Sequence, residues 1–428
     1  MAQETDLNLR NKTIYQIFPR QYSSTHDFEG IIKDLDRIKD LGIDIIYLLP
    51  IHPIGQIDKK GELGCPYSIQ DYEKIDSSLG SENDFKKLIE ETHKRGMRLI
   101  IDCVYNHTSK DSYLFKNHKE YYNFDSDGNV ICKVQDWSDV YDLNFNNKDL
   151  HRILIKYLLK WTKMGVDGFR CDVCSLVPYS FWVKAKKACK KINQNFFLLG
   201  ETVDKSFGKW LSSKGYPVMS DKKALKVFDI IYDYETRWKK DEFLQGKVSV
   251  YDYLKVVYKQ YSSFPDHHII ARFVDNHDVQ RIASFNDERS FIRNFTAMTY
   301  FLKGTNFIYA GDEVCSKHLP SLFDFDEIDW TEYNKYEIVD LLKKLIKLKK
   351  DDIFKIGQFE IINSKKKNVA LIKYSQEDKN LLGIFNFTSK KIVLDLNKEI
   401  NGINVLNDEK IFISSKISIN REPIIIKY

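Results

Sequence analysis

The chain has 428 residues, of which 43% are hydrophobic and 14% aromatic, and its 66 basic and 61 acidic side chains leave a net charge of +5. That length fits two or three domains, and so small a net charge argues against a nucleic-acid partner. The sequence has no uncharged apolar run near the ~20 residues of a membrane helix, so we expect no membrane partner.

Short apolar runs alternate with longer amphipathic stretches over residues 1–350, which predicts a parallel sheet wrapped by helices. The predicted strands are 14–18, 45–49, 98–104, 167–170, 196–199, 227–232, 269–274 and 307–309. Apolar residues at helical spacing predict helices over 28–41, 82–94, 149–164 and 338–348. Gly42 is the expected end of the first helix and Ser81 the expected N-cap of the second.

Two segments depart from this alternation. Residues 108–146 are polar and aromatic, and we interpret them as an excursion that forms a lid or small subdomain. Residues 353–428 contain short alternating strands, which predict an antiparallel β domain with strands at 369–374, 381–387, 391–396, 411–415 and 424–428. The predicted barrel therefore comprises residues 1–107 and 147–352.

Neither the lysines nor the cysteines predict a binding site. The lysine runs at 343–350 and 365–367 are interpreted as a solvated helix face and a hairpin tip. Cys171 and Cys174 form one C-x-x-C, but no second pair completes a zinc site. Seven irregularly placed cysteines and no apolar stretch in the first ten residues predict free thiols and a cytoplasmic location.

Four polar clusters each follow a predicted apolar strand. They read D-C-V-Y-N-H (102–107), G-F-R-C-D (168–172), L-G-E-T (199–202) and F-V-D-N-H-D (273–278). In a barrel of parallel strands, catalytic residues collect where the strands end. Three of the clusters supply a carboxylate, namely Asp172, Glu201 and Asp278, and cleavage of a glycosidic bond needs at least two. Taken alone, Arg170 and Asp172 are equally well explained as a salt bridge at a strand end.

In order and position, these clusters resemble the signature stretches of the α-amylase family, glycoside hydrolase family 13, and in particular its intracellular bacterial members. The resemblance runs from Ile14 to the terminal β domain. It implies a (β/α)8 TIM barrel with a short excursion after the third strand and a C-terminal antiparallel β-sandwich. It also implies a retaining hydrolase that cleaves α-1,4-glucosidic bonds in malto-oligosaccharides or soluble α-glucans.

The resemblance also assigns roles to residues. Asp172 would be the nucleophile, Glu201 the general acid/base and Asp278 the stabiliser of the transition state. Substrate-binding roles fall to Tyr67, His107, Arg170 and His277, and Asp102 would orient Arg170. Arg170 and Asp172 lie two residues apart on a strand, so their side chains should share one face, and the arginine should keep the nucleophile ionised. Trp137 is expected either to line the cleft or to pack in the core, and Tyr72 to be structural.

No cofactor is required for this chemistry, although many α-amylases hold a structural calcium. Asn106 matches one of the family's calcium ligands and Asp142 a second, but calcium takes six to eight oxygens. After Asp172 the chain reads V-C-S-L where many α-amylases have a lysine-histidine pair, which argues against calcium. A zinc or iron site built from the His and Asp residues is an alternative, but no ligand spacing supports one.

Other functions share these residues. An α-glucosidase, an oligo-1,6-glucosidase or a transglucosylase of the same family would keep all of them, and Val173 occurs in some 1,6-acting relatives. The linkage therefore stays open. A non-catalytic binding module is a remote alternative, because such relatives lose catalytic carboxylates that this chain retains.

Overall fold

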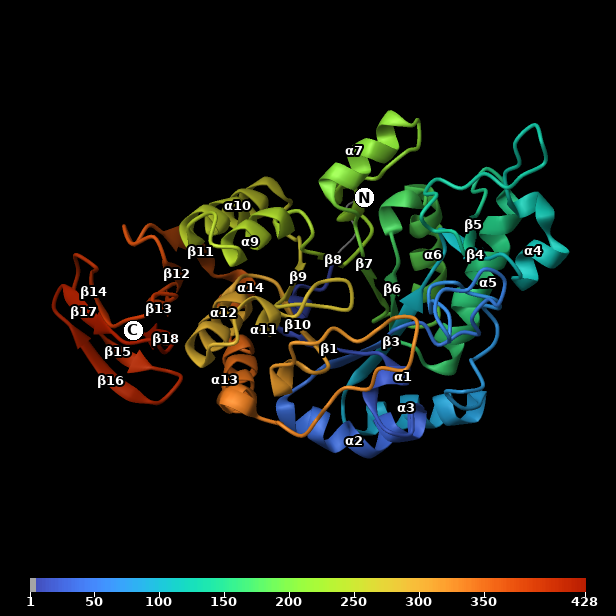
Figure 1. Cartoon of the computed structure of the whole chain (residues 1–428). Coiled ribbons are helices and arrows are strands. Elements are labelled where there is room, and N and C mark those ends of the chain that lie inside the picture. The colour runs from blue at the N-terminus through green and yellow to red at the C-terminus, as the bar shows by residue number, and fades with distance from the viewer. Residues whose placement is uncertain (1–4) are drawn as a thin grey trace.

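Eight parallel strands close into a barrel in a computed structural model that describes residues 5–428 (Figure 1). Around the barrel, β1 lies between β2 and β10, and the order continues β9, β8, β7, β6, β3 and back to β2. The strands are β1 (Thr13–Ile17), β2 (Ile45–Leu48), β3 (Arg98–Cys103), β6 (Gly168–Cys171), β7 (Phe197–Gly200), β8 (Ile230–Tyr232), β9 (Ile270–Phe273) and β10 (Thr305–Tyr309). The predicted (β/α)8 architecture is confirmed.

Helices follow the strands and cover the outside of the barrel (Figure 1). The main ones are α2 (Phe28–Leu41), α3 (Glu82–Lys94), α5 (Lys148–Met164), α6 (Tyr179–Lys190), α7 (Lys205–Ser213), α9 (Arg237–Leu244), α10 (Val250–Ser263), α12 (Arg289–Phe301) and α13 (Ile338–Lys349). Short helical segments are α1 (Pro19–Tyr22), α4 (Tyr113–Asn117), α8 (Asp221–Ala224), α11 (Ile282–Phe285) and α14 (Ile353–Ile356). The predicted caps are present: Ser81 forms a capping box with Asp84, and Gly42 ends α2 in a left-handed conformation with a φ of 99°.

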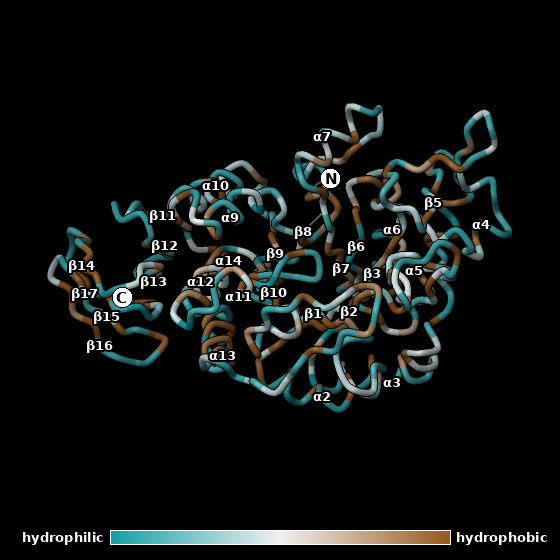
Figure 2. Tube along the Cα trace, viewed as in Figure 1, coloured by the Kyte–Doolittle hydropathy of each residue, from teal (hydrophilic) through white to brown (hydrophobic). Residues whose placement is uncertain are grey.

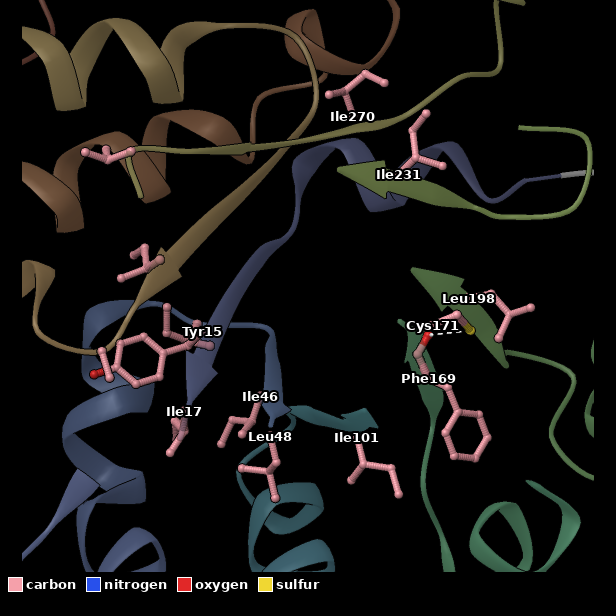
Figure 3. Packing of buried hydrophobic residues seen from close by; sticks show 14 of the residues in the cluster. Tyr15, Ile17, Ile46, Leu48, Ile101, Phe169, Cys171, Leu198, Ile231 and Ile270 are labelled. Carbon is pink, nitrogen blue, oxygen red and sulfur yellow. Dashed lines mark hydrogen bonds between the residues drawn. The ribbon is translucent and has the colours of Figure 1, made fainter. Parts of the chain in front are cut away.

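Alternate residues of each strand enter different cores. Ile14, Tyr47 and Phe307 fill the barrel interior, whereas Tyr15, Ile46 and their counterparts pack against the helices. Figure 3 shows this outer set, which includes Phe169 and Cys171 of β6. In Figure 2 the barrel strands are mostly hydrophobic in colour, while the outer helices alternate between hydrophobic and hydrophilic residues.

The same alternation determines the direction in which the side chains of the polar clusters point. Because Phe169 and Cys171 point to the helices, Arg170 and Asp172 point to the inside of the barrel. By the same period of two, Leu198 packs outward and Leu199 inward, so Glu201 follows Leu199 to the inner side. The strand pattern alone therefore directs these side chains toward one axis.

The predicted excursion after β3 is built on a small antiparallel pair. Strand β4 (His107–Ser109) pairs with β5 (Val140–Asp142), and His107 lies opposite Asp142. The segment between them contains α4 and lies at the right of Figure 1. Nowhere between residues 5 and 428 is a helix both long and apolar enough to span a bilayer.

The C-terminal segment forms two antiparallel sheets that share an apolar core, as the β-sandwich expectation requires. Their strands are β11 (Gln358–Ile362), β12 (Val369–Gln376), β13 (Lys379–Asn386), β14 (Ile392–Asp395), β15 (Ile400–Asn404), β16 (Glu409–Ile413), β17 (Lys416–Ile419) and β18 (Ile424–Lys427). Strands β14 and β17 form the smaller sheet. Hydrogen bonds from Tyr374 to Phe301 and from Asn386 to Asn294 attach this unit to α12.

Some predicted boundaries and elements need correction. The sixth strand begins at Ile230, because residues 227 and 228 end the turn after α8. Strands β11, β15 and β17 were not predicted, because each is only four or five residues long and at most two of its residues are fully buried. Lys349 is buried, and its ammonium donates to the carbonyls of Tyr300 and Leu302, so the lysine run is not wholly a solvated face. The expected domain boundaries stay predictions.

Candidate active site

The polar clusters meet around one cavity at the C-terminal ends of the strands. Its volume is about 210 Å³. It is lined by Lys60, Cys65, Tyr67, His107, Trp137, Asp139, Val140, Asp172, Val173, Glu201, His277 and Asp278. Six residues proposed from the sequence therefore lie together, and the other two, Arg170 and Asp102, are buried next to them.

Arg170 holds three carboxylates at once. Its Nη1 lies 2.9 Å from Asp102 Oδ1 and 2.9 Å from Asp172 Oδ1, while Nη2 lies 2.6 Å from Glu201 Oε1. The guanidinium is fully buried, so these contacts are not screened by water. The sequence predicted the pairing with Asp172 and Asp102. The structure adds Glu201, so one cation connects both proposed members of the bond-breaking pair.

Burial and crowding favour protonated carboxyl groups in this cluster. Burial raises the pKa of Asp172 well above its ordinary value, and the nearby Glu201 acts in the same direction while Arg170 opposes it. Burial likewise raises the pKa of Asp278 and of Asp102. Arg170 opposes this rise in the pKa of Asp172, as the sequence suggested, but burial is the larger effect, and the expectation that the arginine keeps the nucleophile ionised stays a prediction. Burial therefore favours protonation within this cluster, and general-acid chemistry requires a protonated carboxyl group.

Tyr67 and His277 form a stacked pair beside the carboxylates. Their ring centroids are 5.5 Å apart at 14°, and Tyr67 Oη lies 2.6 Å from His277 Nε2. Tyr67 also donates to Asp102 Oδ2 at 2.9 Å, and His277 Nε2 lies 3.3 Å from Asp278 Oδ2. Burial lowers the pKa of His277 to about 3, so the imidazole is neutral at pH 7.

Three contributors were missed by the sequence analysis. Tyr234 donates to Glu201 Oε1 at 3.4 Å and to Asp278 Oδ2 at 3.3 Å. The Gln16 amide contacts His277 Nδ1 at 2.8 Å, and Tyr47 donates to Asp102 Oδ2 at 2.5 Å. Tyr234 follows the sixth predicted strand in a D-Y-E stretch that the sequence analysis did not single out, and Gln16 and Tyr47 lie inside mostly apolar strands. The one signal in the sequence was that each of these residues carries a polar group at a position whose side chain faces the inside of the barrel.

The remaining sequence candidates take up the expected positions. His107 lines the cavity, with its ring centroid 5.4 Å from that of Trp137, and burial lowers its pKa to about 4. Trp137 therefore faces the cavity from the excursion. Tyr72 is buried and donates to the carbonyls of Val104 and His107, a structural role as predicted.

The residues that match calcium ligands do not fit a calcium ion. Lys133 Nζ lies 2.7 Å from Asn106 Oδ1 and 3.8 Å from Asp142 Oδ1, and the Lys133 amide donates to Asp142 Oδ2 at 2.5 Å. A lysine ammonium thus faces the two oxygens that the resemblance assigns to a cation, and it leaves no space for a divalent ion there. Two side-chain oxygens also fall short of the six to eight that calcium takes.

Other metal chemistry finds no support between residues 5 and 428. In that range no group of three or more His, Cys, Asp or Glu side chains is arranged to hold a metal ion. Cys171 and Cys174 are buried free thiols, and burial raises the pKa of both well above the ordinary range. Deprotonation to a metal-binding thiolate is disfavoured accordingly.

Comparison with known proteins agrees with this geometry. The family profile described as "Alpha amylase, catalytic domain" matches residues 16–137 and 132–408. A solved α-amylase from Lactobacillus plantarum is 34% identical with a TM-score of 0.94, and the match covers 99% of this chain and 100% of that one.

Two curated relatives are more distant. Alpha-amylase MalA of Haloarcula japonica is 27% identical over an alignment of 315 residues, which covers 71% of this chain and 44% of MalA, so the match spans less than half of that relative. A probable oligo-1,6-glucosidase 2 of Bacillus subtilis is 25% identical over 393 residues, covering 76% of this chain and 69% of the relative. The named activities of these proteins differ in the linkage they imply.

Proposed function

Because the chain belongs to the α-amylase family of glycoside hydrolases, we propose that it is a retaining enzyme that cleaves α-1,4-glucosidic bonds in malto-oligosaccharides. The observation that carries this proposal is that one guanidinium holds Asp172 and Glu201 beside the same cavity. Double displacement requires two such carboxyl groups flanking the scissile bond.

The two carboxyl groups divide the chemistry. The Asp172 carboxylate attacks the anomeric carbon while Glu201 protonates the glycosidic oxygen, so the C–O bond breaks and the leaving saccharide departs with that proton. The sugar is then esterified to Asp172. Glu201, now ionised, takes a proton from a water molecule whose oxygen attacks the same carbon and releases Asp172. Two inversions restore the α configuration.

Arg170 and Asp278 support the charged stages of this reaction. Arg170 opposes the rise in the pKa of Asp172 that burial causes, which favours the ionised nucleophile. Asp278, held by Tyr234 and next to His277, is assigned to sugar hydroxyls and to the positive charge that develops on the ring. Asp102 fixes Arg170 and Tyr67 from below the cavity.

The cavity suits a single sugar unit. Its 210 Å³ is small beside the about 300–1,000 Å³ of pockets for drug-sized ligands. The Tyr67 ring lines the cavity, where a sugar can pack against it, and the neutral imidazole of His107 can donate to a hydroxyl group. The rest of an oligosaccharide would therefore extend beyond this cavity.

An α-1,6 specificity is the second candidate. It is favoured by Val173 directly after Asp172 and by the relative named as a probable oligo-1,6-glucosidase. The α-1,4 linkage is preferred because the more similar protein, at 34% identity over nearly the whole of both chains, is named an α-amylase.

A reducing cellular compartment is part of the proposal. All seven cysteines are free thiols, and five of them are buried. Several buried cysteines that form no disulfide bonds are typical of proteins in the cytoplasm, where thiols stay reduced.

A product analysis tests the proposed function. The protein is incubated with maltoheptaose and, separately, with isomaltose, and the products are separated by chromatography. We expect shorter malto-oligosaccharides from the first and little cleavage of the second. Proton NMR of the first-formed reducing ends should show the α-anomer. A β-anomer would refute retention, and preferential cleavage of isomaltose would select the 1,6 alternative.

A further inference from the structure

Lys133 occupies an unusual position for a lysine. It lies in the excursion between β4 and β5, its side chain is only 16% exposed, and it reaches back to Asn106 near the end of β3. Lysine is rarely buried without a partner that offsets its charge. Here the partner is Asp142, whose side chain is 7% exposed and whose Oδ1 lies 3.8 Å from Nζ.

The contacts of Asn106 fix which way its amide points. Its Oδ1 accepts from the Lys133 ammonium at 2.7 Å, and its Nδ2 donates to Asp142 Oδ1 at 3.2 Å. An ammonium can only donate and a carboxylate can only accept. Reversing the amide would therefore place like groups against each other at both ends. The orientation is set by the charges rather than chosen between two equal states.

This orientation determines the tautomer of His107. Asn106 Nδ2 also lies 3.0 Å from His107 Nδ1. Because that amide nitrogen can only donate, Nδ1 must accept, and the ring hydrogen is carried by Nε2. His107 lines the cavity beside Asp172 and Glu201, so Nε2–H is its available donor for a substrate hydroxyl.

We propose that Lys133 is a built-in cation that takes the place of a metal ion between the excursion and the barrel, and that it positions His107 as a hydrogen-bond donor to the sugar. The second half of the proposal rests on the proposed function. Lys133 is a positioning residue, because it acts through Asn106 and touches no reacting atom. The excursion thereby contributes its charge to the active site through two consecutive contacts, from Lys133 to Asn106 and from Asn106 to His107.

The same contacts predict how the protein responds to metals. Asn106 and Asp142 are already bound by an ammonium, so a divalent cation would have to displace a covalently attached competitor. Chelators should therefore leave the protein unchanged, and added calcium should add nothing. This separates the chain from relatives that need a metal at the corresponding residues.

The variant Lys133→Met tests the proposal, since methionine has a similar length but no charge. Lys110→Met is the matched control, because Lys110 also lies in the excursion and pairs with a carboxylate, Asp58, without contacting Asn106. For each protein we measure the melting temperature with EDTA and with added CaCl2, and KM and kcat on maltoheptaose. Nitrogen-15 NMR of the substrate-free protein reports the His107 tautomer, with its signal assigned by its loss in His107→Gln.

We expect wild type and Lys110→Met to be insensitive to EDTA and calcium and to carry the His107 hydrogen on Nε2. In Lys133→Met the amide loses one of the two contacts that orient it and only Asp142 remains, so the tautomers should begin to mix and KM should rise about threefold to tenfold with a smaller change in kcat. Loss of wild-type stability in EDTA, or a wild-type hydrogen on Nδ1, would overturn the proposal even if the variant does not fold. A variant with wild-type tautomer and KM would also overturn it.

The tautomer and melting measurements use no substrate. They therefore stand or fall separately from the proposed function, which is decided by the products that wild type releases from maltoheptaose.

Discussion

The backbone amide of Val173 donates a hydrogen bond to Glu201 Oε2 at 2.8 Å, which ties the residue after Asp172 to the other carboxylate of the proposed pair. Val173 adopts a left-handed conformation with φ 33° and ψ 45°. A β-branched residue in that region is strained by about 1–3 kcal/mol. A second bond, from the Cys174 amide to the Glu201 carbonyl at 2.8 Å, holds the turn in place.

Truncation of Val173 should reveal this strain. Glycine adopts left-handed conformations freely, so Val173→Gly should be more stable than Val173→Ala by about 1 kcal/mol. At Val177, where the backbone is extended with a φ of −101°, the order should reverse and alanine should be the more stable. Urea unfolding of the four variants measures both differences. If the glycine and alanine variants have the same order of stability at both positions, Val173 is not strained as proposed.

Tyr234→Phe tests the hydroxyl that bridges Glu201 and Asp278. We expect kcat/KM to fall at least about tenfold, because a hydrogen bond to a charged group contributes about 1.5–3 kcal/mol and about 1.4 kcal/mol corresponds to tenfold in rate. Tyr232→Phe is the control, since the Tyr232 hydroxyl is buried without a hydrogen-bond partner in the described part of the chain. The values of kcat/KM are measured by steady-state kinetics on one oligosaccharide. If both substitutions lower kcat/KM equally, the role assigned to the Tyr234 hydroxyl is wrong.

The barrel and the charged part of the site were open to prediction because both depend on local patterns. The barrel strands are short, mostly apolar and almost wholly buried, and Asp172 and Glu201 directly follow two of them. Once the strands are parallel, their ends must meet, so Asp172 and Glu201 converge without any knowledge of the loops between them. Sequence spacing was sufficient there.

The missed residues depend on contacts across the barrel, which no local pattern encodes. Gln16 and His277 are 261 positions apart, and Tyr47 and Asp102 are 55 apart. Lys133 is one of 66 basic residues, and nothing around it in the sequence marks it as buried. Such contributors become visible only when the distances between strands and loops are known. The weak strands of the C-terminal sheets were missed for a similar reason, since their pairing partners, more than their own residues, define them.

Arg170→Lys should shift the pH dependence of activity. Arg170 lowers the pKa of Asp172 against the effect of burial, and a lysine cannot contact three carboxylates with a planar fork. The pKa of Asp172 should therefore rise in the variant. Because the nucleophile must be ionised, the acidic limb of kcat/KM should move to higher pH, with a loss of at least ~10²-fold at pH 6. A pH–rate profile measures this, and an unmoved acidic limb would contradict the role of Arg170.

His52 should make the protein less stable in acid. It is buried between Tyr72 and Trp161, its Nδ1 contacts the Lys74 carbonyl at 2.8 Å, and burial lowers its pKa to about 4. In the unfolded chain the pKa is about 6.5, so between these values the unfolded state binds more protons and stability falls as pH falls. The contribution is complete above about pH 6.5 and is lost toward pH 4.

His52→Gln keeps an amide donor for the Lys74 carbonyl but does not titrate. Between pH 7.5 and pH 5.0, wild type should lose about 2 kcal/mol more unfolding free energy than this variant. Urea unfolding at both values gives the difference, with His318→Gln as the control because the His318 side chain is 70% exposed. Identical pH slopes in wild type and His52→Gln would refute the linkage.

The two carboxylates of the proposed pair can be told apart by azide. In Asp172→Gly the nucleophile is absent, so with α-maltosyl fluoride the azide anion should attack from the face that Asp172 occupies and give the β-azide. In Glu201→Gln the fluoride leaves without an acid, Asp172 still forms the ester, and azide should attack it from the opposite face to give the α-azide. Both variants should lose at least ~10²-fold in hydrolysis of maltoheptaose while keeping the wild-type circular dichroism spectrum.

Proton NMR of the azide products reads the anomeric configuration directly, because the two variants differ only in which side chain is missing. Opposite anomers require that the two residues act on opposite faces of one sugar, as expected of side chains that Arg170 holds beside one cavity. The same anomer from both variants would mean that one assignment is wrong. Retention of more than about a hundredth of the hydrolytic activity in either variant would show that its missing carboxylate is not the nucleophile or the acid.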